Sequence, residues 1–202
     1  MLSKVAALYV DGSGIYSRMP GVEVWDEARD ARKYAGPYPV VAHPPCARWC
    51  MLAATVERRY GYKRGDDGGC FAAALHAVRS FGGVLEHPAW SAAWRAHDLN
   101  APPLGGAWVN ADFMGGWTTY VSQAHYGHPA QKGTWLYARG VELPLLEWSA
   151  PPPATAVCSY FNIRADDNRP RLRTREASAT PKAFAHVLLA MARSVRQERA
   201  SA

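Results

Sequence analysis

Short apolar runs that alternate with helix-like segments are the feature of this chain that most restricts its fold. The runs cover residues 5–10, 22–25, 39–42 and 83–85, and a polar residue follows each of them. Continuous apolar runs of this length are typical of strands that are buried on both faces of a parallel sheet. The alternation therefore predicts an α/β fold in which helices cover the faces of one sheet.

Two further runs, at residues 117–124 and 134–139, are rich in aromatic and β-branched side chains, which favour strands. The sequence Tyr-Gly-His-Pro at residues 126–129 supplies a turn between them. The two runs are therefore predicted to pair as antiparallel strands, at an edge of a mostly parallel sheet.

Helices are predicted at residues 26–34, 67–81 and 180–193. The second ends at a pair of glycines, and the third begins with Thr180 as the N-cap and Pro181 in its first turn. The third also has an apolar stripe that is expected to pack on the sheet, made by Phe184, Val187, Leu188 and Met191.

Length and composition indicate a single domain. The 202 residues are 49% hydrophobic, which is enough to bury one core. An irregular basic segment is expected at residues 149–180 and a C-terminal helix at residues 180–198. No apolar run approaches the roughly 18 residues of a membrane-spanning helix, and four cysteines are too few for a disulfide scaffold, so we expect a cytoplasmic protein with no membrane partner. These features leave the oligomeric state open.

The net charge is +6, from 23 basic and 17 acidic residues, and the basic residues are clustered. One cluster contains Arg58, Arg59, Lys63 and Arg64, and the other contains Arg164, Arg169, Arg171, Arg173 and Arg175. Such clusters permit attraction to a phosphate backbone, although each also has a plain interpretation as solvated loop surface. DNA is the expected partner, with Arg58 and Arg59 among the residues that bind it.

Two reactive side chains follow two of the predicted strands. The run at residues 39–42 leads into His43-Pro44-Pro45-Cys46, and the run at residues 83–85 leads into Glu86. In sheets of this kind the chemistry lies at the carboxyl ends of the strands. A thiol and a carboxyl at one edge suit covalent attack on a pyrimidine, in which sulfur adds to ring carbon 6 and carbon 5 becomes a nucleophile. We expect an apolar cleft to keep Glu86 protonated near neutral pH, so that it stabilises charge at ring nitrogen 3.

Three motifs resemble, in their order along the chain, motifs of the cytosine carbon-5 DNA methyltransferases. They are Pro44-Pro45-Cys46, Glu86-His87-Pro88, and the turn at residues 126–129 followed by Lys132. The motifs are also similar to those of short phage and prophage proteins, which would place this chain in a bacterial host or a phage-infected cell. Together they cover residues 39–140, about half of the chain.

The resemblance implies a role for each matching residue. Cys46 is the expected nucleophile, Glu86 the pyrimidine-binding acid and Lys132 the cation, at a position where the family usually has arginine. Pro44, Pro45, His87 and Gln123 are expected on the substrate side of the site. The implied fold is a Rossmann-like methyltransferase sheet, and the implied activity is methyl transfer to cytosine in DNA.

S-adenosylmethionine is the donor that the resemblance implies. Its expected contacts are Asp11, Gly12 and Gly14, in a displaced Gly-x-Gly loop, and Asp26 after the second run. Only about 25 residues separate Gly14 from the third run, fewer than the roughly 30 of a βα unit with its next strand. The sheet is therefore expected to be trimmed at its N-terminal, cofactor side. An ordinary turn at residues 11–14 and a capping role for Asp26 are the alternatives.

Other functions stay open at this point. One is a catalytically inactive, methyltransferase-derived phage protein that binds DNA or a partner, and another is a pyrimidine modifier that uses a different donor. A metal site would use His43, Cys46 and Cys50 with Cys70, but the spacing departs from common zinc sites. If the substrate is a base flipped out of DNA, Trp49 and Tyr60 are candidates to stack on it or replace it.

Overall fold

A seven-stranded sheet forms the centre of the protein in a computed structural model that describes residues 2–158 and 167–195. The strand order is β2-β1-β3-β4-β7-β6-β5. The strands are β1 (Val5–Leu8), β2 (Val22–Trp25), β3 (Val40–Ala42), β4 (Gly83–Pro88), β5 (Val109–Asn110), β6 (Trp117–Ser122) and β7 (Gly133–Arg139).

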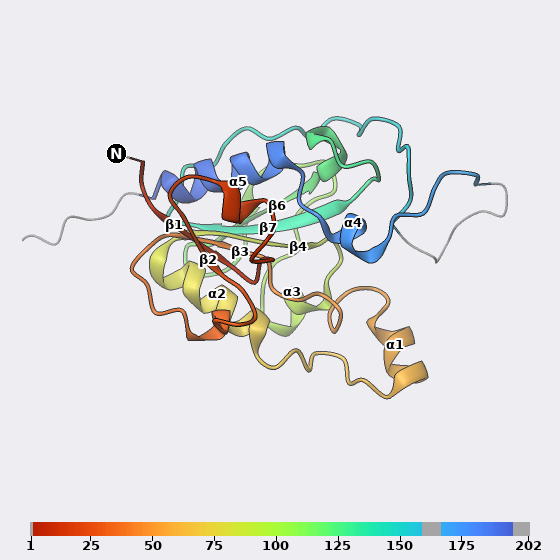
Figure 1. Ribbon diagram of the computed structural model, residues 1–202, viewed down its shortest axis with the longest axis horizontal. Helices are drawn as coiled ribbons and strands as arrows, with labels where there is room; N and C mark the ends of the chain where they lie inside the picture. Colours follow the sequence, from red (N-terminus) through yellow and green to blue (C-terminus); the bar gives the residue numbers. More distant parts are fainter. Residues whose placement is uncertain (1, 159–166, 196–202) are drawn as a thin grey trace, which may run out of the picture.

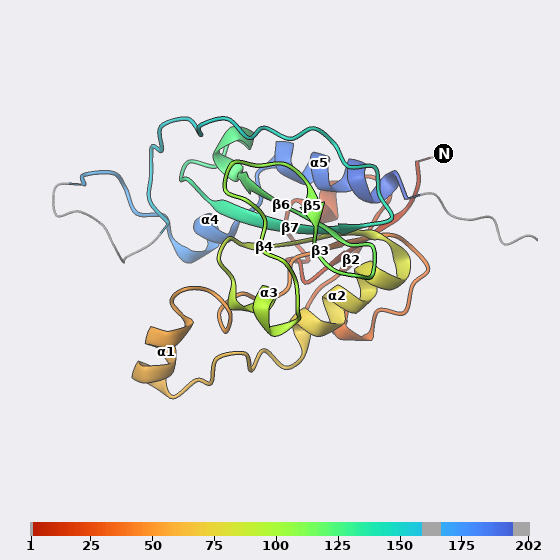
Figure 2. The same ribbon diagram turned by 180° about the vertical axis from the view of Figure 1, so that it is seen from behind.

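Helices lie on both faces of this sheet, so the predicted α/β class is confirmed (Figures 1 and 2). Helix α5 covers one face, and α2 and α3 cover the other. The helices are α1 (Ala53–Tyr60), α2 (Cys70–Phe81), α3 (Ala92–Ala96), α4 (Thr174–Ser178) and α5 (Lys182–Arg193). Three short 3-10 helices are η1 (Tyr16–Arg18), η2 (Ala31–Lys33) and η3 (Gln123–Tyr126).

The sheet is mixed rather than mostly parallel. Strands β2, β1, β3 and β4 are parallel neighbours, whereas β7 is antiparallel to both β4 and β6, and β5 is antiparallel to β6. The predicted antiparallel pair is confirmed as β6 and β7, but the prediction that it is a mere edge is wrong. The reason is that β7 pairs along the whole of β4, so the antiparallel part contains three of the seven strands.

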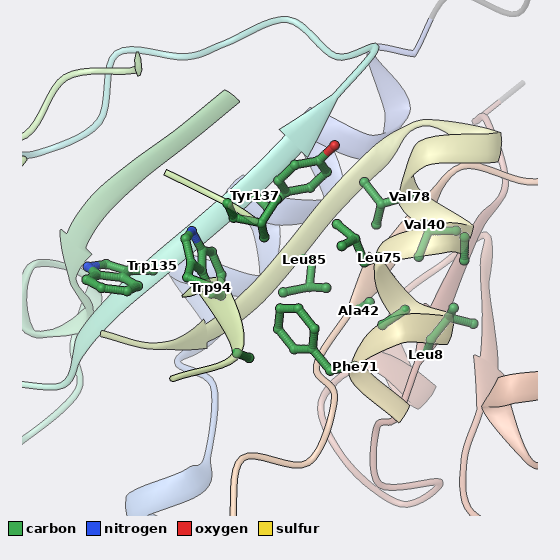
Figure 3. Close-up of a cluster of buried hydrophobic side chains, with 14 of the residues drawn as sticks. Leu8, Val40, Ala42, Phe71, Leu75, Val78, Leu85, Trp94, Trp135 and Tyr137 are labelled. Carbon is green, nitrogen blue, oxygen red and sulfur yellow. The ribbon is translucent and has the colours of Figure 1, made fainter. Parts of the chain in front are cut away.

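Each face of the sheet has its own apolar core. Under α2, the buried side chains include Leu8, Val40, Phe71, Leu75 and Leu85 (Figure 3). Under α5, they include Val5, Val41, Val84, Phe184 and Leu188. Alternate residues of β1, β3 and β4 enter opposite cores, which explains why these strands read as continuous apolar runs.

The boundaries of α2 follow from its flanking residues. Asp67 accepts hydrogen bonds from the backbone N–H groups of Gly69 and Phe71, so the acidic residues form a turn before the helix rather than its first turn. The helix ends as predicted at Gly82, which has a φ of 73°. At the next residue, an added Cβ would lie 2.0 Å from the Val40 carbonyl oxygen, so only glycine lets β4 lie this close to β3.

Two predicted helices differ from the structure. Residues 26–34 form turns and the short η2, because Asp26 accepts from the backbone N–H of Arg29 and closes a turn there. Helix α5 starts at Lys182 with Pro181 as its N-cap and no side-chain cap, so Thr180 does not have the predicted role. In its apolar stripe Val187 is only partly buried, and residues 196–198 lie outside the described part of the chain.

The segment at residues 149–180 is largely irregular where it is described, apart from α4 and one bridge between Val157 and Arg171. Arg164 lies outside the described residues. None of the helices described here is long and apolar enough to cross a membrane.

Candidate functional site

The site begins where β3 and β4 end. In their parallel register Ala42 lies beside Leu85, so the next residues, His43 and Glu86, are neighbours at the carboxyl edge of the sheet. The His43 Nδ1 atom lies 2.9 Å from Glu86 Oε2, and its Nε2 atom lies 2.8 Å from the Tyr16 hydroxyl. Strand β4 continues to Pro88, so Glu86 lies within the strand and not just past its end as predicted.

The buried Tyr16 adds a third side chain to the pair of His43 and Glu86. Burial raises the pKa of Tyr16 well above its usual value of 10.0, and the charge of Glu86 raises it further. The hydroxyl therefore keeps its proton at neutral pH. The His43 ring lies between this hydroxyl and the Glu86 carboxylate, which gives a Tyr16–His43–Glu86 chain.

The other carboxylate oxygen of Glu86 is bound from β7 and η3. Oε1 accepts a hydrogen bond of 2.9 Å from the Gln123 side-chain amide and lies 3.3 Å from the Thr134 hydroxyl. Burial alone raises the pKa of Glu86, but the hydrogen bond from His43 and the charge of Lys132 outweigh it and lower the pKa to about 2. The prediction of a protonated Glu86 is wrong, because the site supplies donors and a cation instead of an apolar cleft.

Cys46 lies within electrostatic range of Glu86 and Lys132. Burial raises the pKa of its thiol to about 11, the charges of Cys50 and Glu86 add to the rise, and Lys132 opposes it. The thiol is partly buried and is protonated at neutral pH. The structure therefore brings together the three predicted catalytic residues, Cys46, Glu86 and Lys132, with the sulfur in its unreactive protonated form.

Lys132 also connects the site to the segment before α5. Its ammonium group donates to the carbonyl oxygens of Ser178 (3.0 Å) and Ala179 (3.2 Å). These two bonds use two of its three hydrogens. The cation is thus held at a fixed place and lowers the pKa of both Cys46 and Glu86.

His87 does not lie with Cys46, Glu86 and Lys132 in the site. Successive side chains of β4 point to opposite faces, so His87 enters the core under α2, where it is fully buried against Phe71 and Trp94. Pro44 and Pro45 do lie beside the site, in the loop between His43 and Cys46. The predicted substrate contact of His87 is wrong for this geometric reason.

The buried His87 makes the stability of the protein pH-dependent. Burial lowers its pKa from 6.5 to about 4, so the unfolded chain takes up a proton at higher pH than the folded chain. We expect the free energy of unfolding to fall by about 3 kcal/mol as the pH decreases through this window. Urea unfolding at about pH 7.5 and about pH 4.5 measures the fall. The His87→Phe variant should lose this part of it, and an equal fall in both proteins would contradict the assignment.

The remaining substrate-side predictions have mixed outcomes. Gln123 is in the site, bound to Glu86. Arg58 and Arg59 are exposed on α1, whereas Trp49 is buried and donates to Asp67 over 2.7 Å. Trp49 is therefore not available to stack on a base, which leaves that role to the exposed Tyr60.

The four predicted cofactor residues gather at the carboxyl ends of β1 and β2. Gly14 donates its backbone N–H to the Asp11 carbonyl and closes a turn, and a Cβ added at Gly12 would lie 2.7 Å from Asp26 Oδ2. Asp11 is held by Ser13 and by an ion pair with Arg175. The alternative of an ordinary turn is present at residues 11–14, whereas Asp26 closes a turn and caps no helix, since the N-cap of η2 is Asp30. Of the four residues, Asp26 beside Gly12 is the one whose position fits a bound ribose.

No group of three or more His, Cys, Asp or Glu side chains within residues 2–158 and 167–195 is arranged to hold a metal ion. Cys70, the fourth residue of the metal hypothesis, begins α2 and interacts with Asp67 and Arg32.

Of the two cavities described here, one lies near a residue of the site and the other lies at the opposite edge of the sheet. One, of about 270 Å³, is lined in part by Ser122, the chain neighbour of Gln123, and the other, of about 310 Å³, lies near Lys4. Cys46 and Glu86 line neither of these two.

Three residues of the site, Tyr16, His43 and Thr134, were not predicted to act with Glu86. A signal for His43 exists in the sequence, because it follows its strand as Glu86 follows the run at residues 83–85, and parallel register makes such residues neighbours. Tyr16 and Thr134 belong to none of the three motifs, and they come close to His43 and Glu86 only through the fold.

Comparison with known proteins identifies no relative: no family model matches the chain, and no curated protein matches it. The resemblance to cytosine carbon-5 DNA methyltransferases therefore rests on the sequence motifs alone.

Proposed function

We propose that this protein modifies a pyrimidine base, cytosine in DNA, through a covalent bond between Cys46 and ring carbon 6. The observation that carries the proposal is that a thiol, an ionised carboxylate and an ammonium group act on one another at one edge of the sheet. These are the groups that the resemblance to cytosine carbon-5 DNA methyltransferases assigns to the reaction.

The charge states of the free site suggest how the proton moves. The thiol of Cys46 begins protonated and Glu86 begins ionised. In one concerted step, sulfur forms its bond to carbon 6 as its proton passes to Glu86, and Lys132 stabilises the negative charge that develops on sulfur. The electrons of the ring double bond move toward nitrogen 3, which receives the proton from Glu86. The net change is one proton moved from sulfur to nitrogen, and Glu86 is ionised again.

One carboxylate oxygen of Glu86 can accept a further hydrogen bond, as this role requires. Among the described contacts, Oε2 accepts one hydrogen bond, from His43, and an ionised carboxylate oxygen accepts two. The Tyr16–His43 pair holds the carboxylate in place. Because Glu86 is only 7% exposed, the base reaches it only after a local opening of the covering side chains.

S-adenosylmethionine is the methyl donor in this proposal, and it supplies a methyl group to the nucleophilic carbon 5. Asp26 would bind its ribose hydroxyls, with the backbone at Gly12 lying close by. Asp11 is already bound to Ser13 and Arg175, which makes it a poor direct ligand. In a complete cycle the carbon 5 proton would pass to solvent as the sulfur leaves, and the proton on nitrogen 3 would return to the sulfur through Glu86, which restores the aromatic ring and the thiol.

Hydrogen exchange at carbon 5 tests the adduct without any donor. Once sulfur has added to carbon 6, carbon 5 can take a deuteron from D2O and release its proton when the sulfur leaves. We expect cytosine in an oligonucleotide to gain deuterium at carbon 5, measured by mass spectrometry of the released nucleosides. Absence of exchange with an oligonucleotide that binds would overturn the proposal.

A second candidate function follows from the same network. Since the thiol is protonated and Glu86 is held by His43 and Gln123, the group is also suited to a purely structural role in a protein that binds DNA or a partner without catalysis. Binding without exchange would favour this function. Exchange without methylation by S-adenosylmethionine would favour a pyrimidine modifier with another donor.

A further inference from the structure

Residues 48–64, which include α1, form an extension that we name the basic arm. In both views α1 stands away from the layers of the fold and is joined to them by irregular chain (Figures 1 and 2). Ala53 is the single buried residue of this helix. Apart from Trp49 at its start, which is buried in the core, packing of the core therefore does not account for the side chains of the arm.

The arm carries positive charge that the protein does not neutralise. It has five basic residues and one acidic residue, Glu57, which pairs with Arg64 over 3.0 Å. Arg58, Arg59 and Lys63 are exposed and form no ion pair among the described contacts. Three cations are thus open to an anionic partner.

The arm also presents two aromatic rings to solvent. Tyr60 is 60% exposed and Tyr62 is 52% exposed, and their ring centroids lie 6.3 Å apart. The guanidinium of Arg48 lies 4.1 Å from the centre of the Tyr62 ring, and that of Arg59 lies 5.5 Å from the centre of the Tyr60 ring. Exposed aromatic rings beside cations are the combination that binds the bases and phosphates of single strands.

The position of the arm connects it to the candidate site. Its first residue follows Cys46 by two positions, at the carboxyl edge of β3. Helix α4, in the second basic segment, lies at the same end of the sheet as α1 in both views (Figures 1 and 2). The arm therefore begins next to the loop that carries the thiol.

We propose that the basic arm binds single-stranded nucleic acid, with bases stacked on Tyr60 and Tyr62 and phosphates contacted by Arg58, Arg59 and Lys63. Stacking needs free base faces, which neighbouring base pairs cover in a duplex, so the arm prefers unpaired strands. The proposal deepens the function proposed above, because it states that Cys46 receives its base from a single strand and not from a closed duplex.

Fluorescence anisotropy with a labelled single-stranded deoxyoligonucleotide and with its duplex tests this preference. We expect the single strand to bind at least about tenfold more tightly. Replacement of both rings, in Tyr60→Ala/Tyr62→Ala, should weaken single-strand binding about tenfold or more and leave duplex binding nearly unchanged. Equal affinity for the two forms, or no effect of the double variant on the single strand, would overturn the proposal.

Removal of the positive charges of the arm should change the salt dependence of binding, which is a separate test. In Arg58→Gln/Arg59→Gln/Lys63→Gln, the slope of log affinity against log salt should decrease by about 2, because each phosphate contact in a single strand contributes about 0.7. The control variant is Lys4→Gln/Arg18→Gln, which removes two exposed charges outside the arm and should change the slope little. Equal slopes in the arm variant and the wild type would show that the arm does not contact phosphate. Circular dichroism confirms that each variant is folded.

Failure of this proposal can be told apart from failure of the proposed function. The binding measurements need no chemistry and are repeated with the Cys46→Ser variant. Arm-dependent binding without exchange at carbon 5 would remove the catalytic proposal alone. Exchange by a protein whose arm variants bind normally would remove the arm proposal alone.

Discussion

The Cys46→Ser variant should lose carbon 5 exchange and methylation by more than about 10³-fold. A serine hydroxyl fills nearly the same space but is a far weaker nucleophile than a thiol, and the charges of Glu86 and Lys132 that act on Cys46 cannot compensate for this. Because Cys46 is only partly buried, the urea midpoint and DNA affinity should stay close to those of the wild type. Nucleoside mass spectrometry gives the rate, and circular dichroism reports the fold.

The neighbouring thiol provides the matched control. Cys50 is also partly buried, and it lies four residues further along the chain. The Cys50→Ser variant should therefore keep most of the exchange rate. If Cys50→Ser is inactive and Cys46→Ser is active, the nucleophile has been assigned to the wrong residue.

Much of the sheet was predictable, because its strands bury both faces and therefore appear as uninterrupted apolar runs. The runs at residues 5–10 and 39–42 contain the fully buried β1 and β3, and the antiparallel pair was found from its β-branched residues and its turn. The common edge of Cys46 and Glu86 followed from the same pattern, since parallel strands end together. The central position of β7 was not predictable, since pairing of β7 with β4 depends on contacts between distant segments.

The electrostatics of the site could not be predicted because they come from five separate segments. Glu86 meets His43 from the loop after β3, Gln123 from η3 and Lys132 before β7, and Tyr16 joins through His43. A strand pattern shows that a carboxyl is buried but not which donors surround it. The expectation of a protonated acid considered only burial, which raises the pKa of Glu86. The hydrogen-bond donors and the Lys132 cation lower this pKa by more than burial raises it.

The predictions failed for α1 and for His87 for related reasons. An amphipathic pattern identifies helices that cover a core. Helix α1 buries one residue, so this kind of pattern could not identify it. His87 was predicted to lie at the edge of the sheet because the predicted strand ended at residue 85. The structure continues β4 by three residues, and the alternation of faces then takes His87 away from Glu86.

The Glu86→Gln variant should lower the exchange rate by at least about 10²-fold while DNA affinity changes little. An amide cannot take the thiol proton and pass it to ring nitrogen 3. The substitution should also cost roughly 1–3 kcal/mol of stability, because the new N–H₂ group faces a donor in either orientation, His43 on one side or Gln123 on the other. The control is Glu142→Gln, at an exposed carboxyl outside this network, which should match the wild type.

The pH dependence separates the role of the charge from a general loss of packing. Glu86 has a pKa of about 2 in the folded protein and an ordinary value of 4.5, so its charge stabilises the fold above pH 4.5. This contribution, about 3 kcal/mol, is lost as the pH falls from 4.5 toward 2. Urea unfolding in this range should show the loss in the wild type and in Glu142→Gln but not in Glu86→Gln. If Glu86→Gln lacks this pH dependence and yet exchanges hydrogen at the wild-type rate, the carboxylate stabilises the fold and carries no proton in the reaction.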